Sequence, residues 1–317
     1  MTLIEVRDLE RRFVIRRKTG RFVRSRDEVV AVRDLTFGIE AGEMVGYIGP
    51  NGAGKSTTIK MLTGILVPSS GHLSVAGLDP SRRRTELARK IGVVFGQRTT
   101  LWWDLPLRDS FEVLQKIYRT DPARHRQNLA EFVELLDLRD LLDTPVRQLS
   151  LGQRMRGDIV AALLHDPDIL FLDEPTIGLD VISKGRLREF LRALNASRGT
   201  TLVLTTHDLQ DIEALCDRVI VIDHGTCVFD GELAELHRHG GSTRTLVVDL
   251  VDEAPAIRVP GADTLRVEGP RQWLAFPADA SAAPIVAAVA AAYDVADLSI
   301  QEPDIEDVIR DLYSRGA

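Results

Sequence analysis

Two kinds of hydrophobic pattern alternate along this chain. Residues 44–48, 168–174 and 200–206 each contain a short, nearly continuous apolar run, which is typical of a strand buried on both faces of a parallel sheet. Residues 3–6 alternate as a half-exposed strand does, and residues 29–39 give two further strand signals. We therefore expect an α/β domain whose chain begins with antiparallel strands.

Helical periodicity appears between the predicted buried strands. Apolar residues recur three or four positions apart at residues 111–118 and 129–136, which predicts amphipathic helices. Since these segments interrupt the strand pattern, we expect an inserted helical subdomain at about residues 98–160. A further helix is predicted directly after residue 56.

The last part of the chain predicts a small separate domain. Residues 236–242 are rich in histidine and glycine and predict a linker. Strands are expected at residues 245–251 and 273–276, a helix at 284–293, and a strand with a closing amphipathic helix at 297–313. The pattern predicts a first domain at residues 1–239 and an α+β accessory domain at residues 240–317.

Length and composition fit a globular protein of about two domains, with 317 residues of which 44% are hydrophobic. The net charge of −7 argues against general nucleic-acid binding. No apolar run approaches the ~20 residues of a membrane helix, and the N-terminus lacks a signal-peptide pattern, so a cytoplasmic protein is expected. Cys216 and Cys227 lack metal-ligand spacing and are expected to be reduced thiols.

Residues 49–56, Gly-Pro-Asn-Gly-Ala-Gly-Lys-Ser, have the spacing of a phosphate-binding loop between a strand and a helix. Glycines let the backbone approach the phosphates, and the N–H groups at the helix start supply partial positive charge. Lys55 adds a full positive charge, and the Ser56 hydroxyl is a ligand that suits Mg²⁺. This loop predicts binding of a nucleotide with its magnesium ion.

Polar residues stand at the ends of three predicted strands, residues 90–97, 168–174 and 200–206. Asp173 and Glu174 end one strand, and because neighbouring strand residues point to opposite sides, they can take different tasks. One can reach a magnesium ion while the other faces an attacking water. Gln97 and His207 each end another strand, where α/β proteins place their chemistry, although such residues often only cap a turn.

Two further segments allow a functional and a purely structural interpretation. Ser150, just before a predicted helix, either binds an anion with its hydroxyl or serves as an ordinary N-cap. The adjacent Trp102 and Trp103 cannot both face one side of a helix or strand. At least one of them is therefore available to a partner, unless both pack beneath their loop.

The segment between Arg11 and Arg26 is strongly basic and is interrupted by no acidic residue until Asp27. It predicts either contact with an anionic partner, such as lipid head groups or nucleic acid, or a solvated hairpin whose charges discourage aggregation. Within it, Phe13 is expected either to stack on an adenine ring or to pack in the core.

These motifs occur in the order found in the nucleotide-binding subunits of ATP-binding cassette (ABC) transporters, which residues 1–235 resemble. The loop at 49–56 matches Walker A and residues 169–174 match Walker B. The remaining matches are the Q-loop Gln97, the signature at 149–153, the D-loop at 178–180 and the switch His207. The signature differs from the usual Leu-Ser-Gly-Gly-Gln at Leu151; because Ser150 and Gly152 remain, phosphate binding is expected to persist.

The resemblance implies a P-loop ABC ATPase fold with a RecA-like core, an antiparallel β-subdomain and a helical subdomain. It also implies two copies that pair head to tail around two ATP, with Mg²⁺. Glu174, His207 and Gln97 would serve in hydrolysis, and Ser56, Gln97 and Asp173 would surround the metal. The implied ATP-binding residues are Phe13, Gly49, Pro50, Asn51, Gly52, Ala53, Gly54, Lys55, Ser56 and Thr57, with Ser150, Gly152, Gln153 and Asp180 completing the site across the pair.

The sequence around Gln97, Trp102 and Ser150 resembles that of the ATPases of bacterial drug and sodium exporters, which use two distinct permease chains. This resemblance implies an ATPase on the cytoplasmic face of the membrane, which contacts its permeases near Trp102 and Trp103 and binds no nucleic acid. The alternatives are a soluble ABC ATPase acting on ribosomes or DNA, which the basic segment alone favours, and a regulatory membrane ATPase that moves no cargo.

Overall fold

The computed structural model describes residues 1–18, 24–96, 98–206, 208–240, 243–277, 280–301 and 308. The chain divides into two compact units, Met1–Gly231 and Glu232–Ala317, which are described separately below. Helix α8 (Leu233–Gly240) falls in the second unit, so this division lies ahead of the predicted boundary after residue 239.

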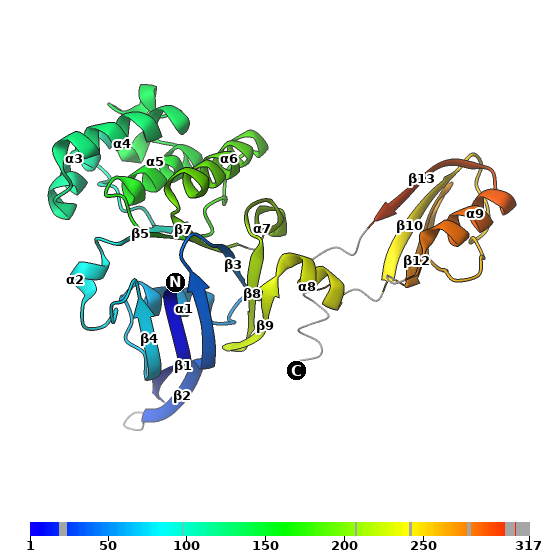
Figure 1. Ribbon diagram of the computed structural model, residues 1–317, viewed down its shortest axis with the longest axis horizontal. Helices are drawn as coiled ribbons and strands as arrows, with labels where there is room; N and C mark the ends of the chain where they lie inside the picture. Colours follow the sequence, from blue (N-terminus) through cyan, green and yellow to red (C-terminus); the bar gives the residue numbers. More distant parts are fainter. Residues whose placement is uncertain are drawn as a thin grey trace. The chain divides into compact units, whose positions relative to one another are not determined.

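A six-stranded sheet with the order β5-β6-β7-β3-β8-β9 forms the centre of the first unit (Figure 1). The pairs from β5 to β8 are all parallel, and their apolar runs are buried as the continuous pattern predicts. Strands β8 and β9 were not among the predicted strands. The six strands are β3 (Met44–Ile48), β5 (Ile91–Phe95), β6 (Ile169–Asp173), β7 (Thr201–Thr205), β8 (Arg218–Asp223) and β9 (Thr226–Glu232).

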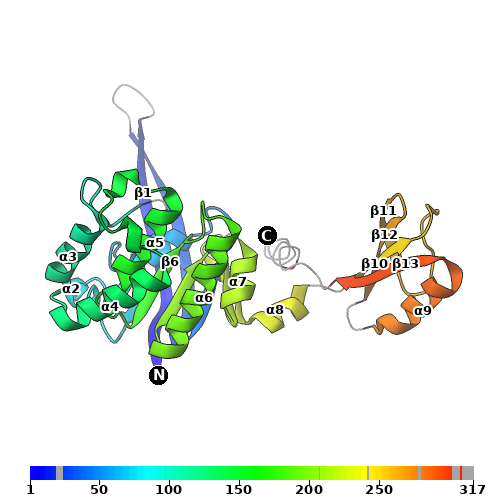
Figure 2. The ribbon, with the colours of Figure 1, turned by 90° about the horizontal axis from the view of Figure 1, so that it is seen from above.

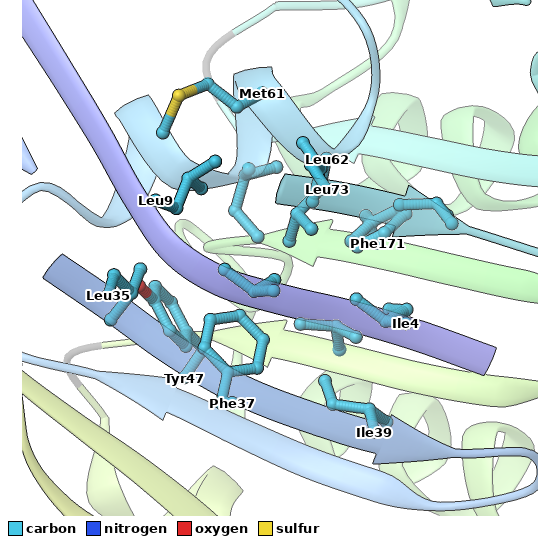
Figure 3. Packing of buried hydrophobic residues seen from close by; sticks show 14 of the residues in the cluster. Ile4, Leu9, Leu35, Phe37, Ile39, Tyr47, Met61, Leu62, Leu73 and Phe171 are labelled. Atoms are coloured by element: carbon cyan, nitrogen blue, oxygen red, sulfur yellow. The ribbon is translucent and has the colours of Figure 1, made fainter. Parts of the chain in front are cut away.

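A three-stranded antiparallel sheet with the order β2-β1-β4 covers one face of the parallel sheet. Its strands are β1 (Thr2–Lys18), β2 (Arg24–Glu40) and β4 (Ser70–Val75). Figure 3 shows the shared core, in which Ile4 and Leu35 of this sheet pack in one cluster with Tyr47 of β3, Met61 of α1 (Lys55–Leu62) and Phe171 of β6. This core fixes the position of the loop between β3 and α1.

Helices α5 and α6 lie over the other face of the parallel sheet (Figures 1 and 2). Helices α3, α4 and α5 gather at one end of the unit, which agrees with the expected helical subdomain. The helices of this unit are α1 (Lys55–Leu62), α2 (Arg84–Leu87), α3 (Leu107–Tyr118), α4 (Pro122–Leu135), α5 (Leu151–Leu163), α6 (Val181–Arg198) and α7 (Leu209–Leu215).

The second unit contains a four-stranded antiparallel sheet with the order β11-β12-β10-β13. Its strands are β10 (Thr243–Leu250), β11 (Asp263–Glu268), β12 (Arg271–Pro277) and β13 (Val295–Gln301). Helix α9 (Ala282–Ala292) packs Ile285 and Val289 against Leu246, Leu274 and Phe276. The predicted α+β character is confirmed, whereas the predicted closing helix lies outside the described residues apart from the buried Val308.

Among the described residues, no helix is both long and apolar enough to cross a membrane.

Candidate active site

The phosphate-binding loop connects β3 to α1 and depends on two glycines in the left-handed region. Gly52 has φ +87° and Gly54 has φ +103°, a conformation that side chains rarely adopt. A Cβ atom at Gly54 would lie 2.5 Å from the Ala31 carbonyl oxygen, whereas one at Gly52 would meet no heavy atom within 4 Å. The loop therefore packs tightly against β2 on one side and leaves open space beside Gly52.

Helix α1 begins at Lys55 without a side-chain cap, because its N-cap residue is Gly54. An N-terminus of this kind attracts an anion, since its N–H groups and the helix dipole carry partial positive charge. The ammonium of Lys55 donates to the carbonyl oxygens of Gly49 (2.5 Å) and Pro50 (3.1 Å), so it folds over the same loop. The loop and the lysine together fit the phosphates of a nucleotide.

The charge of Lys55 lies within electrostatic reach of the two carboxylates at the end of β6. Burial lowers the pKa of the Lys55 ammonium, and the negative charges of Glu174 and Asp173 oppose that shift. The phosphate-binding loop follows β3 and the predicted carboxylate pair ends β6, so the parallel pairing through β7 places both at one edge of the sheet. The grouping is the one that a metal-assisted phosphoryl reaction requires.

Neighbouring strands hold the Asp173 carboxylate and the backbone of Glu174 in place. Asp173 Oδ1 accepts a hydrogen bond of 2.6 Å from the Thr205 hydroxyl of β7, and the Asp173 carbonyl accepts from the Gly96 N–H. Glu174 has φ +56°, a left-handed conformation that costs about 1–3 kcal/mol in a non-glycine residue. Its N–H donates to the Thr205 carbonyl. A sharp bend therefore separates the direction of Glu174 from that of Asp173.

A buried ion pair, which the sequence analysis missed, fixes the segment that follows Glu174. The Asp211 carboxylate is fully buried in α7 and accepts from the Thr176 hydroxyl at 2.6 Å. Arg188 of α6 lies 2.5 Å from the same carboxylate. No local signal identifies this group, because its three members come from separate elements that only the fold brings together.

Ser150 forms the N-cap of α5, as its structural interpretation predicts. Its hydroxyl oxygen accepts from the Gln153 N–H at 3.2 Å, and the Gln153 side chain accepts from the Ser150 N–H at 2.9 Å. This capping box leaves the hydroxyl hydrogen of Ser150 able to donate. The cap and anion binding are therefore compatible.

Several other predicted residues have intrachain contacts. Asp180 caps α6, with its oxygens accepting from the Ser183 N–H (2.9 Å) and hydroxyl (2.8 Å). Phe13 is half-buried in β1, and the Arg11 guanidinium lies 4.6 Å from its ring centre. Ser56 and Asn51 are exposed, Thr57 is half-buried, and Ala53 is buried.

Gln97 and His207 lie outside the described residues, so their roles stay predictions. Their neighbours end β5 and β7, which flank β6 in the sheet, so both positions follow strands that end at the same edge.

Trp102 and Trp103 are 37% and 50% exposed. The Arg154 guanidinium lies 5.2 Å from the centre of the Trp103 ring. Each indole therefore keeps a solvent-facing surface, and contact with a partner remains a prediction.

Comparison with known proteins identifies the family. A family model described as ABC transporter matches residues 32–177. The ABC transporter ATP-binding protein NatA of Bacillus subtilis is 34% identical over 235 residues, covering 74% of this chain and 92% of the relative. The chain belongs to the ABC transporter family.

Two further similarities agree with this assignment. The daunorubicin/doxorubicin resistance ATP-binding protein DrrA of Streptomyces peucetius is 36% identical over 260 residues, covering 77% of this chain and 78% of the relative. A solved dimeric ATP-binding cassette in a post-hydrolysis state, bound to ADP and Pi, matches with a TM-score of 0.62 and 26% identity, covering 73% of this chain and 98% of that chain. This ABC subunit is thus an ATPase, and the predicted family, fold and ATP hydrolysis are confirmed.

Proposed function

We propose that this ABC ATPase drives export through separate membrane-spanning subunits, and that two copies close around two ATP molecules. The juxtaposition of Lys55 with Asp173 and Glu174 supports the hydrolytic part of this proposal most strongly. The resemblance to drug and sodium exporter ATPases supports export. Under this proposal the protein is a peripheral subunit on the cytoplasmic face of the membrane.

Each residue of the site would have a separate task. The loop amides and Lys55 hold the β- and γ-phosphates of ATP, and Phe13 stacks on the adenine. Ser56 and Asp173, with Gln97, would hold Mg²⁺, which neutralises phosphate charge when bound. Glu174 accepts the proton of the attacking water, and His207 contacts the γ-phosphate.

The pairing of two copies is supported by the chemistry at the start of α5 and α6. Ser150 retains a hydroxyl hydrogen that can donate to a phosphate of the partner's ATP, next to Gly152 and Gln153. Val181 and Ile182, which follow Asp180, are 86% and 71% exposed, an unusual position for large apolar side chains unless another surface covers them. The matched solved cassette is itself dimeric.

Glu174→Gln tests the hydrolytic assignment. The amide keeps the size of the side chain but cannot accept a proton, so ATP turnover should fall by at least about 100-fold. Asp168→Asn is the matched control, because it also replaces a carboxylate by an amide. Asp168 directly precedes β6, at the end away from Glu174, and forms an exposed ion pair with Lys90. Turnover of Glu174→Gln close to that of the control would reject the assignment.

Affinity purification tests the proposed partners. Tagged Glu174→Gln protein would be isolated from its native cells in mild detergent with Mg-ATP, with Lys55→Ala as the control whose ATP binding should be weakened. Mass spectrometry should recover two distinct multi-span membrane proteins, bound through the surface around Trp102 and Trp103. Recovery of ribosomal or DNA-associated proteins instead would favour the soluble alternative.

A further inference from the structure

Two leucines and two glycines interlock where α5 begins beside the segment that leads to α6. Gly178 has φ +73°, and a Cβ atom there would lie 2.2 Å from Leu151 Cδ2. In the opposite direction, a Cβ atom at Gly152 would lie 2.9 Å from Leu179 Cδ2. Each leucine therefore packs on the glycine of the other segment, and a side chain at either glycine would force that leucine to shift.

The second of these segments starts at the residue that we assign to water activation. From Glu174 the chain passes through Thr176, which the buried Asp211 holds, and ends at Asp180, which caps α6. Both ends of the segment are thus anchored to helices. Between these anchors, Gly178 and Leu179 pack against Leu151 and Gly152 of α5.

Leu151 is an unexpected residue for the start of this helix. It replaces the glycine of the usual signature, and it remains 38% exposed, so it contributes less burial than a core leucine would. Its contact with Gly178 depends on the exact place of Cδ2, which occupies the space that a side chain at Gly178 would need. A glycine at residue 151 would leave Gly178 without this cover.

We propose that Leu151 is a positioning residue that ties the signature at the start of α5 to the segment carrying Glu174. This inference rests on the proposed pairing of two copies. In such a pair the signature meets the partner's ATP, whereas Glu174 acts on the ATP of its own subunit. The contact between Leu151 and Gly178 therefore links closure of one ATP site to the hydrolytic geometry of the other.

Leu151→Ala and Leu151→Met test this role. Alanine removes the atoms that reach Gly178, so the kcat for ATP hydrolysis should fall by about 3- to 30-fold, the range of coupling effects between sites, and the Hill coefficient should fall toward one. Nucleotide affinity of the single subunit should stay within about twofold, because Leu151 belongs to the start of α5 and not to the phosphate loop at residues 49–56. Methionine, which is similar in volume and flexible, should restore kcat and cooperativity.

A second variant tests the contact without relying on Leu151→Ala alone. Gly178→Ala should lower kcat and melting temperature strongly in the presence of Leu151, and less in the Leu151→Ala background, where the clash is removed and only backbone strain remains. Equal effects of Gly178→Ala in the two backgrounds would overturn the proposal. Unchanged kcat and Hill coefficient in Leu151→Ala would do the same.

A measurement of dimerisation distinguishes a failure of this inference from a failure of the proposed function. The Glu174→Gln protein is mixed with ATP, and size-exclusion chromatography reports whether it dimerises. If that protein stays monomeric, the paired site is rejected and the proposed link between two sites is rejected with it. If it dimerises while Leu151→Ala hydrolyses ATP cooperatively like the unaltered protein, only the role of Leu151 fails. Dimerisation together with the loss of cooperativity in Leu151→Ala supports both.

Discussion

The two sheets of this protein have opposite designs. In the first unit, β3, β6 and β7 are parallel and buried, and their carboxyl ends meet at one edge. In the second unit, β10 and β12 are antiparallel and bury the side chains of one face beneath α9. Parallel strands collect loops and polar strand ends at a single edge, whereas antiparallel strands distribute them between two edges.

This difference explains why the predicted chemistry lies in the first unit. At the edge of the parallel sheet, Lys55, Asp173 and Glu174 come from segments far apart in sequence and influence one another electrostatically. In the second unit, the charged pair Arg271 and Asp249 joins neighbouring strands through two hydrogen bonds of 2.6 Å. The two charges neutralise each other across paired strands. The pair therefore stabilises the register of β10 and β12 and does not serve as a ligand-binding group.

Phe276→Ala should have the largest effect, and it tests whether the two units are independent. Phe276 is 1% exposed in the core beneath α9, so its truncation should destabilise the second unit by about 3–5 kcal/mol. ATP affinity should remain within about twofold. Denaturant unfolding and a nucleotide-binding titration measure the two quantities, with the exposed Leu265→Ala as control. A marked loss of ATP affinity would contradict the independence of the two units, because it would show that the second unit contributes to ATP binding.

Arg188→Met should have the next largest effect and concerns the first unit. It would leave the fully buried Asp211 carboxylate without its cation, which costs about 3 kcal/mol of unfolding free energy. Urea unfolding measures this loss. The exposed Arg192→Met, one turn further along α6, should change stability little. Equal stability of the two variants would show that the buried ion pair does not hold the segment after Glu174.

Lys55→Ala should have the smallest effect of the three in free energy, yet the most specific one. Losing the charge-assisted contacts to phosphate should weaken ATP binding by about 10- to 100-fold, while the fold stays intact. Binding of a fluorescent ATP analogue measures the change, and Lys60→Ala in the last turn of the same helix is the control. Similar affinities in both variants would contradict the assignment of the phosphate site.

Much of the fold was predictable because buried parallel strands and amphipathic helices have local signatures. The runs at β3, β6 and β7 and the helices α3 and α4 were anticipated from such patterns. Strand β11 was not predicted, because most of its residues are exposed and it therefore lacks an apolar pattern. Its register is also irregular between Thr264 and Arg266. The N-cap was one of the two interpretations of Ser150, and the structure adds the reciprocal bond of Gln153, which makes it a capping box.

The phosphate loop, the place of Asp173 and Glu174 at a strand end, and the family can all be inferred without a structure. These features depend on residues that are close in sequence, so spacing alone reveals them. The folded chain was needed to find that Asp211, paired with Arg188, holds Thr176, and that Leu151 packs on Gly178. Such contacts join residues from separate elements, and their existence depends on distances of a few ångströms that packing of the whole unit sets.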